Sequence, residues 1–78
     1  MKVVVQLFGF LAEQAGRSRL DVSVDRPVVA AVVDAAAREA GLRIDPGVRF
    51  AVNTDYAAPD AAVREGDVVS LLPPVGGG

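Results

Sequence analysis

The chain has 78 residues, 51% of them apolar and 23% charged, and a formal net charge of −2. This length fits one small domain, and the composition is too apolar for a disordered chain. The weak acidic charge argues against a nucleic-acid-binding protein, because phosphate contacts need clustered Lys and Arg.

Cysteine and histidine are both absent. Their absence excludes disulfides, thiolate metal sites, a cysteine nucleophile and the usual near-neutral acid–base group. The first apolar segment, which follows Met1 and Lys2, is too short for a secretory signal or a membrane span. We therefore expect a cytoplasmic protein that binds neither nucleic acid nor membrane.

The first 24 residues predict two strands. Residues 2–8 (KVVVQLF) and 19–24 (RLDVSV) alternate between two faces, as half-buried strands do. Residues 10–15 between them favour a short helix, which Gly16 would end.

A longer helix is predicted after Pro27. Apolar residues fall on one helical face, namely Val29, Val32, Val33, Ala36 and Ala40. Gly41 is the expected end of this helix. Val28 stands at the expected N-cap, where its side chain cannot accept a hydrogen bond from the first turn.

The last third of the chain predicts three more extended segments. Residues 49–53 and 68–72 read as strands. Residues 56–60 contain Pro59, so they can form only a short edge element. Asp55, Asp60, Glu65 and Asp67 lack metal-loop spacing, so we interpret these acids as turn-forming and expect no metal site.

This element order predicts an α+β domain of the β-grasp (ubiquitin-like) fold. A mixed four- to five-stranded sheet would be covered on one face by one main helix. The first and last strands are the most apolar, so we expect them at the sheet centre, and parallel to each other if they are neighbours. One domain would span residues 1–78, with a globular body (1–72) and a flexible C-terminal tail (73–78).

The C-terminal tail is the segment that could take part in a reaction. Pro73 and Pro74 end the last strand, since neither can donate to a sheet ladder. Glycines without Cβ could then enter a narrow slot. The terminal α-carboxylate has a reference pKa of about 3.3–3.7 and is ionised at neutral pH. It could attack the α-phosphorus of ATP, and a sulfur donor could replace the adenylate; a partner would supply the catalysis.

Residues 66–78 (GDVVSLLPPVGGG) resemble the C-terminus of the MoaD-like proteins, the small subunits of molybdopterin synthase. The opening VVVQLFG at 3–9 and the AVN at 51–53 are similar too, so the resemblance covers the whole chain. The Pro-Pro-Val-x-Gly-Gly ending is its most specific part. Gly76 occupies the variable place, and Val28 stands where relatives often have Thr.

The resemblance implies a non-catalytic sulfur carrier for molybdenum cofactor biosynthesis. An adenylating enzyme of the ubiquitin-activating type (MoeB-like) would use ATP to activate the Gly78 carboxylate, which then becomes a thiocarboxylate. The large subunit of molybdopterin synthase (MoaE-like) would receive the tail, and sulfur would pass to cyclic pyranopterin monophosphate. This chain itself would bind no cofactor.

The expected site has two parts. Gly77 and Gly78 form the reactive end. The predicted partner-binding residues are Phe8, Tyr56, Leu72, Pro73, Pro74, Val75 and Gly76. Period two places Phe8 on the uncovered face, with Ser70 and Leu72 on the wetter face of the last strand, and exposed apolar patches usually bind partners. The alternative is that Phe8 packs under the short helix as core.

Other functions remain open on the sequence. The carrier could feed thiazole synthesis, as ThiS-like proteins do, or cysteine synthesis or tRNA thiolation. It could also be a protein modifier that forms isopeptide bonds, or an interaction module with an inert tail. The glycines could be a cloning remnant.

Overall fold

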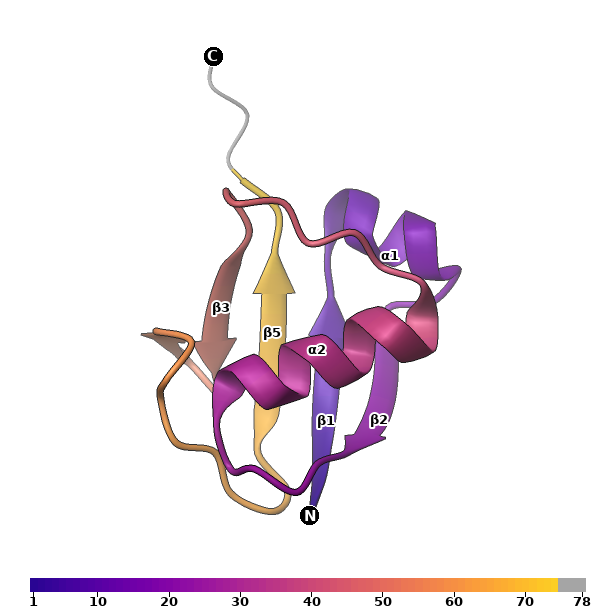
Figure 1. Cartoon of the computed structure of the whole chain (residues 1–78). Helices are drawn as coiled ribbons and strands as arrows, with labels where there is room; N and C mark the ends of the chain where they lie inside the picture. Colours follow the sequence, from indigo (N-terminus) through magenta and orange to yellow (C-terminus); the bar gives the residue numbers. More distant parts are fainter. Residues whose placement is uncertain (75–78) are drawn as a thin grey trace.

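The computed structural model describes residues 1–74, which form five strands and two helices (Figure 1). In chain order these are β1 (Lys2–Leu7), α1 (Gly9–Ala15), β2 (Arg19–Ser23), α2 (Val29–Ala40), β3 (Arg49–Val52), β4 (Asp55–Ala57) and β5 (Val68–Leu72). The predicted β-grasp fold is confirmed, with a mixed sheet crossed on one face by α2.

The sheet has the strand order β2-β1-β5-β3-β4. β1 and β5 are parallel neighbours, in register at Val5 with Val69 and at Leu7 with Leu71, as predicted. The pairs β1–β2, β3–β5 and β3–β4 are antiparallel. The two most apolar strands therefore occupy the centre of the sheet, where both of their edges are covered.

The core lies between the sheet and α2. Val5, Val69 and Leu71 have no exposed side-chain surface, and the facing α2 residues Val29 and Val32 are equally buried. The apolar face that the 2.0-residue period gives the strands packs against the apolar face that the 3.6-residue period gives α2. Burial of this apolar surface is the main stabilising contribution to the fold.

The N-terminus of α2 is capped by main chain from another part of the molecule. Val28 is the N-cap, as predicted, and makes no side-chain capping bond. The N–H groups of Val29 and Ala30 instead donate to the carbonyl oxygens of Ala61 (2.9 Å) and Pro59 (2.8 Å). The segment after β4 thus satisfies donors that a capping side chain would otherwise bind.

Short turns position the remaining elements. Gly16 and Gly41 end the two helices in the left-handed conformation, as predicted. Asn53, between β3 and β4, has a φ of 56°. Its side-chain oxygen accepts from the Val68 N–H (3.1 Å), and its amide nitrogen donates to Asp67 (3.3 Å). Asn53 therefore ties the β3–β4 turn to the start of β5.

Within residues 1–74, neither helix has the length and apolar character needed to cross a membrane.

Candidate functional site

The C-terminal segment leaves the sheet between the ends of two neighbouring strands. After Leu72, Pro73 packs on Gly9, the first residue of α1: a Cβ added to Gly9 would lie 2.9 Å from the Pro73 Cγ. Pro74 packs on Gly47 in the α2–β3 loop, where an added Cβ would lie 3.0 Å from the Pro74 Cβ. Figure 1 shows this loop passing beside the end of β5.

The predicted site residues Val75, Gly76, Gly77 and Gly78 lie outside the described residues. The structure therefore describes the base of the C-terminal segment and the surface around it.

Four side chains line up across the open face of the sheet, the face turned away from α2, at the end where β5 finishes. We call Phe8, Leu72, Arg49 and Tyr56 the open-face cluster. Phe8 continues the alternation of β1 in an extended conformation, with φ −130° and ψ 156°. The parallel register places Phe8 next to Leu72, and Leu72 pairs with Arg49 on β3.

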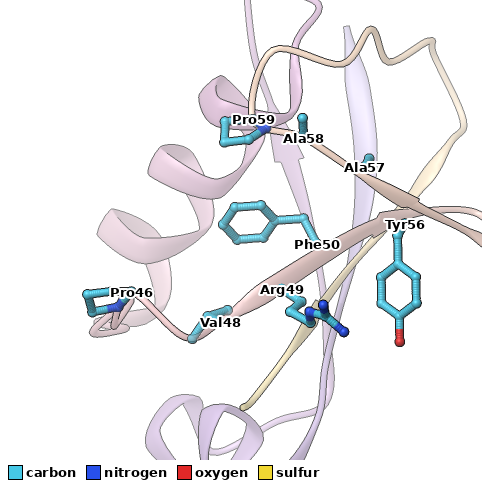
Figure 2. Close-up of a pocket in the computed structure, with 8 residues that line it drawn as sticks. All are labelled: Pro46, Val48, Arg49, Phe50, Tyr56, Ala57, Ala58 and Pro59. Carbon is cyan, nitrogen blue, oxygen red and sulfur yellow. The ribbon is translucent and has the colours of Figure 1, made fainter. Parts of the chain in front are cut away.

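Arg49 and Tyr56 form the outer half of this cluster. The Arg49 guanidinium lies 5.1 Å from the centre of the Tyr56 ring, within cation–π range. Figure 2 shows these two side chains together, whereas the ring of Phe50 is directed toward α2. An open groove of about 550 Å³ runs past these residues along the β3–β4 edge.

Exposure separates the predicted partner-binding residues into two groups. Phe8 is 43% exposed and Tyr56 is 71% exposed. Phe8 is therefore not buried beneath α1 as a core residue. The prediction that Leu72 stands exposed is wrong, because its neighbours on β1 and β3 leave it half-buried. Pro73 is also half-buried, and Pro74 is exposed.

The prediction that Ser70 marks a wet face is also wrong. Ser70 is 7% exposed, although it lies on the open face. It sits on the central strand with Gln6 of β1 on one side and Ala51 of β3 on the other, so both edges of the strand are paired around its small side chain. The open face is therefore drier along β5 than the serine suggests.

Arg49 is the member of the cluster that the sequence did not reveal. The arginines are scattered along the sequence and form no run, which is the pattern of ordinary solvated surface. The signal that could have found it is the two-residue period of β3, which puts Arg49 on one face with Ala51. Only the antiparallel register with β5 and the hairpin to β4 place it between Leu72 and Tyr56.

The acidic residues act in turns. Asp67 accepts hydrogen bonds from the N–H of Arg64 (2.8 Å) and from the side chain of Asn53. Glu65 accepts from the N–H of Lys2 (3.0 Å). In the part of the chain that the structure describes, no three carboxylates gather to hold a metal ion.

Comparison with solved structures places the fold among small ubiquitin-like proteins. SAMP1, the small archaeal modifier protein 1 of Haloferax volcanii, is 28% identical, with all of both chains covered and a TM-score of 0.86. A chain of the complex between subunits 1 and 2 of molybdopterin-converting factor from Helicobacter pylori is 26% identical, again over both full chains, with a TM-score of 0.67.

A third neighbour supports the fold alone. A chain of the BexX/CysO complex of Amycolatopsis orientalis is 20% identical, with a TM-score of 0.72, and the match covers 97% of this chain and 99% of that one. Comparison with curated proteins gave no significant match. The sequence matches the ThiS family over residues 5–78, which is nearly its whole length. The chain therefore belongs to the ThiS family of ubiquitin-like sulfur carriers.

Proposed function

We propose that this protein carries sulfur for molybdopterin biosynthesis on the carboxyl group of Gly78. An oxygen of this carboxylate attacks the α-phosphorus of ATP on an adenylating enzyme, and pyrophosphate leaves. A sulfur nucleophile then attacks the acyl carbon, AMP leaves, and a thiocarboxylate remains. The thiocarboxylate donates its sulfur to cyclic pyranopterin monophosphate on the large subunit of molybdopterin synthase.

The observation that carries the proposal is the extent of the family match. It runs through residue 78 and so includes Gly77 and Gly78. The specific pathway is supported by the Pro-Pro-Val-x-Gly-Gly ending and by the similarity to the Helicobacter pylori molybdopterin-converting factor complex.

The open-face cluster is the proposed docking surface. Phe8 and Tyr56 are large exposed apolar side chains, and such residues favour partner binding. Arg49 adds a fixed positive charge beside Tyr56, so a partner with a carboxylate at the matching position would gain a charge-assisted hydrogen bond. The cluster lies at the end of the sheet from which the C-terminal segment departs, so one partner could hold both.

Intact-mass measurement tests the proposal directly. The protein is incubated with an adenylating enzyme of the ubiquitin-activating type, ATP and sulfide. We expect one oxygen of the chain to be replaced by sulfur, and this sulfur to be lost on addition of the large subunit and cyclic pyranopterin monophosphate. A chain that never gains sulfur would rule out the carrier function.

The matched control is the chain that lacks Gly78. It should fold as the full chain does, because the core lies within residues 3–71, and it should not yield the product dithiolene. Equal product formation by this truncated chain would contradict the assignment of the reactive group.

A second candidate function is protein modification, which the similarity to the Haloferax volcanii modifier favours. In that case a lysine amine of another protein would attack the acyl carbon, AMP would leave and an isopeptide bond would form. High-mass conjugates in cells that disappear on removal of Gly78 would support modification. Turnover of the thiocarboxylate by the large subunit, without conjugates, would support the molybdopterin role.

A further inference from the structure

We propose that Gly9 and Gly47 are positioning residues that form a glycine seat for Pro73 and Pro74. The seat would set the direction in which the C-terminal segment leaves the sheet. The expected effect on the rate of adenylation rests on the proposed function. The expected effect on the positions of Pro73 and Pro74 does not.

Gly9 forms one side of the seat. It directly follows Phe8 at the end of β1 and has a φ of 56°. A Cβ built on Gly9 would lie 2.9 Å from the Cγ of Pro73, closer than real Cβ atoms approach a neighbour. The Pro73 ring therefore occupies the space that any other residue at position 9 would need.

Gly47 forms the other side. An added Cβ would lie 3.0 Å from the Cβ and 3.3 Å from the Cγ of Pro74. The φ of Gly47 lies outside the left-handed region, so the local backbone does not itself require glycine there. The close approach of the Pro74 ring is the feature of this position that a side chain would disturb.

The sheet topology explains why the seat has two sides. β5 lies between β1 and β3. Gly9 follows the end of β1, and Gly47 precedes the start of β3. The two glycines thus come from the two strands that flank β5, and the two prolines leave β5 between them.

A proline ring transmits a displacement to the main chain. The ring closes on its own backbone nitrogen, so it cannot rotate away as a long side chain does. A Cβ at Gly9 would therefore displace the Pro73 ring, and a Cβ at Gly47 would press on the Pro74 ring, so both would act on the backbone of the segment. Pro73 and Pro74 are the first two residues after β5, so a shift of their backbone changes the position and the direction from which the rest of the segment starts. A reacting group that is 1 Å out of place can lose about 10²-fold in rate.

The experiment compares Gly9→Ala and Gly47→Ala with the control Gly16→Ala. Gly16 has a φ of 72°, and an added Cβ there would meet no atom within 4 Å. The control thus matches the backbone cost of Gly9→Ala without touching a proline. Gly47→Ala tests the seat without that backbone cost, so it remains informative if Gly9→Ala does not fold.

Two readouts are measured for each variant. The first is the set of ring ¹³C resonances of Pro73 and Pro74 together with the amide resonance of Val75. The second is the steady-state kinetics of the adenylating enzyme with the carrier as varied substrate. We expect the resonances to move in Gly9→Ala and Gly47→Ala and to stay in place in Gly16→Ala. We also expect kcat to fall about tenfold in the two seat variants, with KM changed by less than about twofold.

A folded Gly47→Ala with wild-type kcat, or with unmoved proline resonances, would overturn the proposal. A higher KM at constant kcat would also overturn it, because the glycines would then belong to the docking surface. If the wild-type chain itself is not adenylated, the proposed function fails, and the resonances alone decide whether the seat holds the prolines.

Discussion

The N–H of Ala30 in the first turn of α2 donates a hydrogen bond to the carbonyl oxygen of Pro59, at 2.8 Å. The neighbouring N–H of Val29 donates to Ala61 in the same segment, and Val63 donates back to Pro27. The main chain between β4 and β5 therefore caps the first turn of α2, in place of the side-chain hydrogen bond that the N-cap residue Val28 cannot make.

A first prediction concerns Val28. Replacing an apolar N-cap residue with a capping one typically stabilises a helix by about 1 kcal/mol. Val28→Thr, which keeps the shape of the side chain, should gain less than about 0.5 kcal/mol, because the donors it would satisfy are already bonded. Urea unfolding measures the difference. A gain in stability of about 1 kcal/mol would show that the hydrogen bonds from Ala30 and Val29 contribute little in solution.

A second prediction concerns Asn53. Asn53→Ala should destabilise the fold by about 2–3 kcal/mol, since it combines a left-handed φ with loss of the bonds to Val68 and Asp67. Asn53→Gly removes the same bonds without the backbone strain, so its cost should be about 1 kcal/mol. Thermal or urea unfolding of the pair separates the two causes. Equal costs would mean that strain plays no part.

A third prediction concerns the central strand. Leu71 has no exposed surface and lies in register with Leu7 across the parallel pair. Leu71→Ala should cost about 2–5 kcal/mol, a large share of the stability of a small domain. The adjacent Leu72→Ala should cost less, because Leu72 is half-buried on the open face. The reverse order in urea unfolding would contradict the assigned faces.

A fourth prediction concerns docking through the open-face cluster. Phe8→Lys places a charge on a side chain that is 43% exposed, so the fold should survive while the Kd for both proposed partners rises at least about tenfold. Isothermal calorimetry with each partner measures the effect.

Ala62→Lys is its control, since it adds the same charge at an exposed position in the segment that caps α2. We expect Ala62→Lys to bind both partners as the wild type does. If both variants weaken binding equally, the cause is the added charge and not the loss of Phe8. If a folded Phe8→Lys binds as tightly as the wild type, Phe8 is not part of the docking surface.

Local periodicity carried much of the fold. The alternation at Val3, Val5 and Leu7 identified a strand and its buried face, and the helical spacing of Val29, Val32 and Val33 identified α2. These patterns are readable because each depends on neighbours within a few positions along the chain. The apolar character of β1 and β5 indicated their central place in the sheet, and the structure shows that they are neighbours.

Contacts between segments that are distant along the chain could not be predicted from the sequence. Arg49 looked like any exposed arginine until register placed it between Leu72 and Tyr56. Ser70 looked solvent-facing until its central position covered it. Nothing in the sequence indicated that Gly47 matters, because the residue packed against it, Pro74, is far from it along the chain.

The sequence by itself thus determined the element order, the buried faces, the family and the Gly-Gly ending, all of which depend on short-range pattern or on composition. The tertiary structure alone decided what surrounds the C-terminal segment: the open-face cluster, the backbone cap of α2 and the two glycines beneath Pro73 and Pro74. The physical reason is that these contacts join residues that are far apart along the chain, so strand order and register must exist before the contacts do.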